Sequence, residues 1–386
     1  FLTTYLVLNI SAGIETLLQS PSFRPTFRVH WALSLLGAVG CLGVMFLINA
    51  IATVVAALIV TIIYFWLQRR ELQVTWGDVR RGLWMALISK AIYQVAGAED
   101  SKNWRPHLLV LSGAPRKRWS LIELADGFSH NRALMTVATV LPEGSRDPGQ
   151  QVKMETTIRD YLAKRGVKAL VRLSTADDPF VGALNLIETY GLGDLTPNTV
   201  LLGSTESPER FAAYCHLLQQ VHIAQRNIII FHENPERVFG RKKRIDIWWG
   251  GVQSNGGLML MLAYLLRTDI RWRSAQIYLK LVVQDATAAQ AARLNLESLI
   301  SSARIKAEPM VIIAGDRSFE DILYQSSASA DLVFLGMARP HEPANFQDYY
   351  KSLSQRAQNL PSTVFVLAAP DFAFAEVVGA PRKVST

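Results

Sequence analysis

The sequence of 386 residues is short of the features that mark most enzymes and secreted scaffolds. Its two cysteines, Cys41 and Cys215, are too few for a disulfide framework, and neither has a partner at metal-ligand spacing. It contains no Walker sequence, nucleophile elbow or HExxH motif. Half of the residues are hydrophobic and only 19% are charged, which excludes disorder. The sequence therefore predicts no catalytic residue, no metal site and no enzyme activity.

Charge is missing altogether from residues 29–67, which contain no lysine, arginine, aspartate or glutamate. A membrane span needs about 20 apolar residues, so this run is long enough for two spans joined by a tight turn. Asn49 is the most polar point near its middle and is the natural turn. We expect residues 31–47 and 51–67 to form a membrane hairpin, and a signal peptide is excluded by the length. A buried helical hairpin of a large soluble protein is the alternative.

Positive charges flank this run and predict its orientation. The flanking residues are Arg24 and Arg28 before it, and Arg69 and Arg70 after it, whereas the turn carries no charge. The positive-inside rule then places both flanks, and everything that follows, in the cytoplasm. Residues 1–18 are expected to end an earlier span, so the chain is interpreted as a fragment of a multi-pass protein of the plasma (inner) membrane.

A connecting segment over residues 71–106 is expected to contain an amphipathic helix over residues 77–96. Apolar side chains recur along one face of this helix, and its basic residues lie elsewhere. Such a helix either lies at the membrane surface near anionic head groups or packs on protein as an ordinary connector. The sequence favours neither.

From residue 107 onward, short apolar runs alternate with helical stretches, which predicts a parallel sheet covered by helices on both faces. The same order recurs, so we expect two tandem doubly wound halves, residues 107–240 and 241–386, derived by duplication. The predicted strands cover residues 108–111, 134–140, 169–173, 200–202, 228–231, 245–249, 277–283, 310–313, 332–335 and 364–367.

Four glycines are the candidates for a nucleotide or anion site. Gly203 and Gly336 end strands at similar places in the two halves, and Gly256 and Gly257 belong to a glycine-rich loop that follows a strand and opens a helix. Phosphate-binding loops have this arrangement because glycine lets backbone N–H groups approach the anion. The loop fits no nucleotide fingerprint, so a tight strand-to-helix connection is the alternative.

The net charge of +8 is partly concentrated in the basic run at residues 241–244. No interleaved aromatic residues accompany this run. We therefore expect it to face anionic lipid or acidic protein, and we expect no nucleic-acid partner.

Several short segments occur in a fixed order and together resemble the cation–chloride cotransporter family. They are residues 20–27 (SPSFRPTF), 74–77 (VTWG), 99–113 (EDSKNWRP, then LVLSG), 191–199 (GLGDLTPNT) and 245–266 (IDIWW, then GGL and YLL). The family patterns that they resemble are S-P-G-W-R-P-x-F, V-N-W-G, E-D-H-x-K-N-x-R-P-x-x-L-V-L-T-G, G-L-G-x-x-x-P-N-T and I-D-V-W-W…G-G-L…Y-L-L. Ser101 departs from the family, which tends to have histidine there, and Ser254 and Asn255 stand near a usual aspartate.

The resemblance implies the C-terminal part of an electroneutral symporter that moves K⁺, Na⁺ or both with Cl⁻. Residues 1–70 would then hold its last spans, followed by two halves similar to universal stress proteins that serve dimerisation and regulation. It implies no cofactor beyond the transported ions, and it implies a second copy and the lipid bilayer as partners. The ion-binding residues are expected in spans that this sequence does not contain. A membrane-tethered nucleotide sensor and an amino acid permease of the same superfamily are the alternatives.

Overall fold

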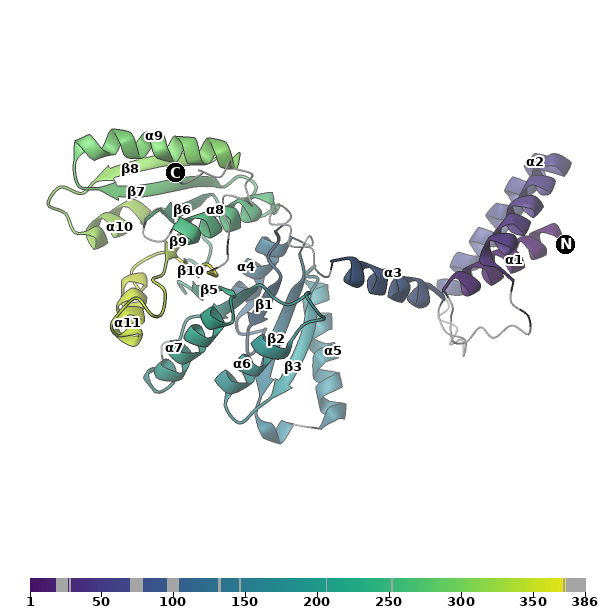
Figure 1. Ribbon diagram of the computed structural model, residues 1–386, viewed down its shortest axis with the longest axis horizontal. Coiled ribbons are helices and arrows are strands. Elements are labelled where there is room, and N and C mark those ends of the chain that lie inside the picture. The colour runs from purple at the N-terminus through teal and green to yellow at the C-terminus, as the bar shows by residue number, and fades with distance from the viewer. Residues whose placement is uncertain are drawn as a thin grey trace, which may run out of the picture. The chain divides into compact units, whose positions relative to one another are not determined.

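The computed structural model describes residues 1–18, 27, 29–69, 79–95, 104–130, 133–145, 147–205, 207–250, 253–370 and 372. It divides the chain into two units, Phe1–Ala98 and Glu99–Thr386, which we call unit 1 and unit 2. Figure 1 shows the elements of each unit. Of the residues expected to orient the chain in a membrane, Arg24, Arg28 and Arg70 lie outside the described residues.

The described part of unit 1 is helical. Its elements are α1 (Leu2–Leu18), α2 (Trp31–Arg69) and α3 (Val79–Val95). Arg69, the remaining orienting residue, ends α2, and α3 coincides with the predicted connecting helix.

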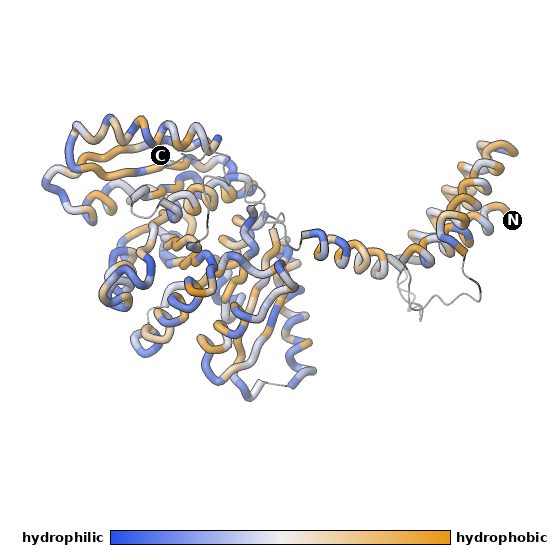
Figure 2. The backbone as a smooth tube through the Cα atoms, in the orientation of Figure 1, coloured by the Kyte–Doolittle hydropathy of each residue, from blue (hydrophilic) through white to orange (hydrophobic). Residues whose placement is uncertain are grey.

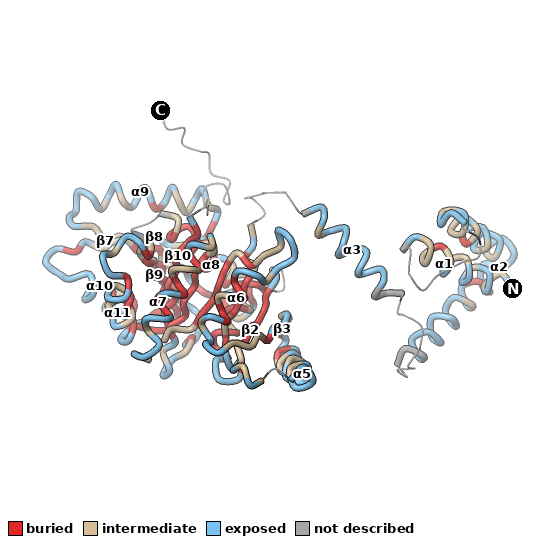
Figure 3. Tube along the Cα trace, turned by 60° about the horizontal axis from the view of Figure 1, so that its bottom comes forward, coloured by how far each residue is buried: buried red, intermediate tan, exposed pale blue. Residues whose placement is uncertain are grey.

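Helix α2 contains the charge-free run and is interrupted where the sequence predicts a turn. Asn49 leaves helical geometry, with φ −161° and ψ 102°, and its Oδ1 accepts a hydrogen bond from the Ala52 N–H at 3.0 Å, as an N-cap does. The stretch Trp31–Trp66 is one candidate membrane helix by length and composition, and Figure 2 colours it mostly as hydrophobic. Only 6% of its most apolar window is buried, so most of its residues are exposed (Figure 3). Its division into two spans stays a prediction.

Unit 2 is α/β, as the sequence predicts, and each of the ten predicted strands is present. The strands are β1 (Leu108–Leu111), β2 (Met135–Leu141), β3 (Leu170–Thr175), β4 (Thr199–Gly203), β5 (Asn227–His232), β6 (Arg244–Trp248), β7 (Gln276–Val283), β8 (Glu308–Ile313), β9 (Leu332–Gly336) and β10 (Thr363–Leu367). The helices are α4 (Trp119–Ser129), α5 (Pro148–Lys164), α6 (Pro179–Thr189), α7 (Pro208–Ile223), α8 (Gln253–Thr268), α9 (Ala286–Ala303), α10 (Phe319–Ser327) and α11 (Phe346–Ala357), with a short 3₁₀ helix at Glu143–Ser145.

Helix starts in unit 2 follow local sequence signals. Helices α5, α6 and α7 each begin with proline, whose missing N–H costs nothing in the first turn. Asp147 caps α5 by accepting hydrogen bonds from two backbone N–H groups, and Asp178 caps α6 in the same way.

The ten strands form one sheet in the order β3-β2-β1-β4-β5-β10-β9-β6-β7-β8. All neighbouring strands are parallel except β5 and β10, which pair antiparallel with Thr363 opposite His232. Because of this one antiparallel pair, the carboxyl ends of β1 to β5 and those of β6 to β10 lie at opposite edges of the sheet. The sequence predicts two tandem doubly wound halves and does not predict that they share one sheet. The boundary at residue 240 stays a prediction.

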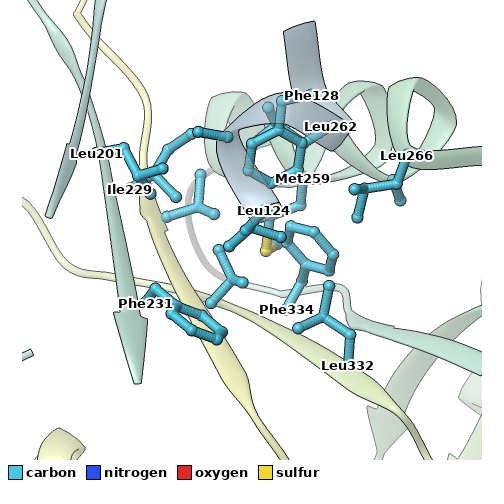
Figure 4. Close-up of a cluster of buried hydrophobic side chains, with 14 of the residues drawn as sticks. Leu124, Phe128, Leu201, Ile229, Phe231, Met259, Leu262, Leu266, Leu332 and Phe334 are labelled. Atoms are coloured by element: carbon cyan, nitrogen blue, oxygen red, sulfur yellow. The ribbon is translucent and has the colours of Figure 1, made fainter. Parts of the chain in front are cut away.

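The core lies on both faces of this sheet because strand side chains alternate between them. On one face, Ile229 and Phe231 join a cluster with residues of α4, α5, α8 and α9, part of which Figure 4 shows. On the other face, Ile228 and Ile230 join a cluster with residues of α6, α7, α10 and α11. Figure 3 shows the strands as the most buried part of unit 2.

Candidate functional site

Two hollows lie at carboxyl ends of strands in unit 2. In open α/β sheets, ligands bind outside the carboxyl ends of the strands, where the strand order reverses. The strand order places such points between β1 and β4 and between β6 and β9. A cavity of about 250 Å³ lies at the β1–β4 point, and one of about 480 Å³ lies at the β6–β9 point. We call them the first and the second pocket.

The first pocket is framed by the end of β4 and the loop between β1 and α4. Gly113 turns this loop with φ +61°, a conformation that suits glycine, and its carbonyl accepts a hydrogen bond from Thr139 Oγ1 at 2.5 Å. Across the pocket, the Tyr214 hydroxyl donates to the Gly203 carbonyl at 3.0 Å. Burial raises the pKa of Tyr214 well above its usual value, so the hydroxyl remains a donor.

Two arginines make the first pocket cationic. Arg118 precedes α4, and its guanidinium covers Gly203 so closely that a Cβ there would lie 2.9 Å from Nη1. Arg210 reaches the same pocket from α7. Among the described residues, neither arginine has an ion-pair or hydrogen-bond partner for its side chain. Guanidinium groups bind carboxylate and phosphate oxygens with two parallel hydrogen bonds, so the pocket suits an anion.

The second pocket is mostly apolar, and the charged side chains Arg356 and Glu342 that line it already have partners. Apolar and aromatic side chains such as Trp248 and Phe319 line it, and they stack edge-on with ring centroids 5.5 Å apart. Its arginine, Arg356, already pairs with Glu320 at 2.7 Å. Its acid, Glu342, accepts a hydrogen bond from the Arg339 backbone N–H at 3.0 Å. The pocket therefore suits an uncharged group better than an anion.

The four predicted glycines do not come together in one site. Gly203 lines the first pocket and Gly336 lines the second. Gly256 lies under the Trp249 indole, where a Cβ would come within 2.6 Å of the ring, and Gly257 is buried in α8. The space beside Gly256 is thus filled by the chain's own side chain, and a role for these glycines in nucleotide binding stays a prediction.

No sequence pattern marked Arg118, Arg210 or Asn255 as a binding residue. Arg118 ends a basic run, residues 116–118, in the loop between β1 and α4, which is a weak signal by itself. Its importance depends on Gly203, which only the sheet brings beside it. Asn255 lines the second pocket and bonds to two strand ends, yet it looks like one more polar residue of the glycine-rich loop. Within the described residues, no cluster of histidine, cysteine, aspartate and glutamate could hold a metal ion.

Comparison with known proteins gives two kinds of match. The model of solute carrier family 12 matches residues 118–236 and 224–318, just over half of the chain together. The solved cytoplasmic domain of a prokaryotic cation chloride cotransporter is 19% identical, with a TM-score of 0.53, over 72% of this chain and 100% of that one. A universal stress protein from Archaeoglobus fulgidus is 14% identical, with a TM-score of 0.43, over 68% of this chain and 97% of that one.

Proposed function

The chain belongs to solute carrier family 12, and from this membership we propose that it is the C-terminal part of an electroneutral symporter that carries chloride with potassium, sodium or both. Members of this family are membrane transporters, so the function requires no bond chemistry. The family match carries the proposal. The fold of unit 2, which resembles the cytoplasmic domain of a cation chloride cotransporter, agrees with it.

The geometry of α2 supports two membrane spans. Thr53 Oγ1 donates to the carbonyl oxygens of Met45 and Asn49, each at 2.9 Å. Along an unbroken helix, eight residues would separate Met45 from Thr53 by about 12 Å. The helix is therefore sharply bent at Asn49, and the exposed apolar side chains on both sides of the bend suit a lipid environment better than a soluble core.

We further propose that unit 2 lies in the cytoplasm, where it supports dimerisation and regulation. The arginines that flank the apolar run support this orientation through the positive-inside rule. The resemblance to the cotransporter family supports the dimer.

Tracer uptake tests the transport proposal. The complete transporter that contains this sequence is reconstituted in liposomes, and ⁸⁶Rb⁺ uptake is compared with chloride or gluconate outside. We expect uptake when chloride is outside. When gluconate replaces chloride, uptake should fall to the level of empty liposomes, because the cation and chloride move together. Uptake that is independent of chloride would contradict the proposal, and chloride-independent uptake of an amino acid would favour a permease.

Cysteine labelling tests the hairpin. In a variant with Cys41→Ala and Cys215→Ala, Ile48→Cys should react with a membrane-impermeant maleimide added to intact cells. Ile48 is 72% exposed and adjoins the break at Asn49, and its substitution leaves the Asn49 side chain and its cap intact. The control, Ser298→Cys on the exposed side of α9, should react only after permeabilisation. Labelling of Ile48→Cys only after permeabilisation would contradict the topology.

We also propose, as a second function that can coexist with transport, that the first pocket binds a nucleotide. The observation in its favour is that Arg118 and Arg210, whose side chains have no ion-pair or hydrogen-bond partner among the described residues, line the same pocket as Gly203. Phosphate oxygens would accept hydrogen bonds from both guanidinium groups.

ATP binding to the full chain in detergent tests this second function. A hydrogen bond to a charged group contributes about 1.5 to 3 kcal/mol, so Arg118→Ala and Arg210→Ala should each weaken binding about tenfold or more. Arg356→Ala in the second pocket is the matched control and should leave ATP affinity unchanged. Absence of ATP binding by the folded chain, or equal affinity in all variants, would contradict the assignment.

A further inference from the structure

A basic cleft lies at the amino ends of β7 and β8, and we propose that it binds a phosphate group. The cleft has a volume of about 370 Å³ and is lined by three cationic side chains, Arg267, Arg273 and Lys306. These come from three separate segments, the last turn of α8, the turn before β7 and the loop before β8. We call it the β7–β8 cleft. It shares no residue with the first or the second pocket.

The walls of the β7–β8 cleft are held by contacts within unit 2. Arg267 Nη1 donates to the Lys306 carbonyl, which ties the end of α8 to the loop before β8. The turn before β7 is anchored by Trp272, whose side chain is buried in the core. The same turn is closed by a hydrogen bond from the Ala275 N–H to the Trp272 carbonyl at 2.8 Å. Arg273 therefore projects from a fixed turn, and the cleft does not depend on a ligand for its shape.

Within the described part of unit 2, positive side chains outnumber negative ones in the cleft. Arg273 and Lys306 are exposed, and among the described residues their side chains have no ion-pair or hydrogen-bond partner. Among the described residues that line the cleft, Glu308 supplies the one carboxylate. Three cations beside one acid raise the local positive potential, which attracts anions.

The acids in the neighbouring turns are engaged elsewhere. Asp269 pairs with Arg271, whose Nη2 lies 2.5 Å from Asp269 Oδ2. Asp331 accepts hydrogen bonds from backbone N–H groups, among them that of Lys243 at 2.7 Å. The Lys243 carbonyl in turn accepts the Gln276 N–H at 2.8 Å, which places another basic residue next to the strand that lines the cleft.

Phosphate fits this arrangement better than a carboxylate does. A phosphate group offers oxygens to two guanidinium groups and one ammonium group at once, whereas a carboxylate offers only two oxygens. The phosphate could belong to a lipid head group or to a soluble phosphate compound, since the chemistry of recognition is the same.

Titration with inorganic pyrophosphate tests the cleft itself. The full chain in detergent carries Arg118→Ala and Arg210→Ala, so that the first pocket does not contribute. We expect Arg273→Ala with Lys306→Ala to weaken pyrophosphate binding about tenfold or more, and higher salt to weaken it further. Arg273→Lys with Lys306→Arg keeps both charges and should retain binding. This result would show that the alanine variant loses binding through lost charge and not through unfolding. Arg293→Ala on α9 is the surface control and should change nothing.

Nanodiscs separate the two sources of phosphate. Hydrogen exchange over residues 269–277 and 304–308 is compared with and without phosphatidic acid in phosphatidylcholine nanodiscs, and with added pyrophosphate. If phosphatidic acid protects these residues and Arg273→Ala with Lys306→Ala abolishes the protection, the cleft binds a lipid head group. If only pyrophosphate protects them and the same substitutions abolish the protection, the cleft binds a soluble phosphate compound. No protection by either, or protection that survives the substitutions, would overturn the proposal.

Discussion

Replacing Asp246 by alanine is expected to lower the free energy of unfolding of unit 2 by about 3 to 5 kcal/mol. Asp246 on β6 and Lys280 on β7 are both fully buried, with 0% of each side chain exposed, and Lys280 Nζ lies 2.6 Å from Asp246 Oδ2. Lys280 also donates to the carbonyl and the hydroxyl of Ser326, each at 2.7 Å. Removing the carboxylate leaves an ammonium group in the core without a counter-charge, which is the source of the loss.

The loss should depend on pH. Burial lowers the pKa of Lys280, and the charge of Asp246 opposes that effect. Without Asp246 the folded pKa falls further below the unfolded value of about 10.4. Between these two values the unfolded chain binds more protons than the folded chain, so stability rises with pH. The deficit of Asp246→Ala should therefore shrink as the pH is raised toward 10.

Urea unfolding of the full chain in detergent, followed by near-UV circular dichroism, measures this effect. Asp246→Leu combined with Lys280→Met removes both charges and should recover most of the stability. Arg293→Ala, which breaks the exposed pair with Glu297, should cost less than about 1 kcal/mol. A loss of less than about 1 kcal/mol in Asp246→Ala, or no recovery in the double variant, would contradict the interpretation.

Asn255→Ala is expected to destabilise unit 2 by about 2 to 4 kcal/mol. Asn255 is buried at the start of α8, where Nδ2 donates to the Met337 carbonyl at 2.7 Å and Oδ1 accepts the Ala368 N–H at 2.8 Å. The side chain thus joins α8 to the ends of β9 and β10. Each buried main-chain group left unpaired costs about 1 to 3 kcal/mol, and the adjoining second pocket lets water relieve part of that cost.

The same unfolding experiment measures this loss, and the neighbouring Ser254→Ala is its control. Ser254 is half-buried on the same turn, so its loss should cost about 0.5 kcal/mol or less. Asn255→Asp keeps the acceptor for Ala368 but sets a carboxylate oxygen against the Met337 carbonyl, so it should recover only part of the stability. Equal stability of Asn255→Ala and Ser254→Ala would show that the two hydrogen bonds contribute nothing.

The local elements were predictable because their signals are local. The ten strands are apolar runs of a few residues each, and the break in α2 coincides with Asn49, the most polar residue of an uncharged stretch. The resemblance to the cation–chloride cotransporters is also carried by short segments in order, and the match to solute carrier family 12 confirms it. A strand or the break in α2 can be recognised within a short window, whereas the resemblance depends on the order of several short segments along the chain.

The candidate sites were not predictable in the same way because they depend on contacts between distant segments. The sequence pointed to Gly203 and Gly256, yet the first is covered by the Arg118 guanidinium and the second by the Trp249 indole. A glycine pattern signals that something approaches the backbone closely, and it does not say whether that is a ligand or another side chain.

The sequence by itself therefore determined the α/β class, the strands, the apolar segment with its interruption, and the family. Tertiary structure alone decided that β5 and β10 pair antiparallel, which joins all ten strands in one sheet and sends the two pockets to opposite edges. It alone also brought Arg267, Arg273 and Lys306 to one cleft. The physical reason is that hydrophobic periodicity is encoded along the chain, whereas pairing between remote strands and the convergence of charge arise only once the chain has folded.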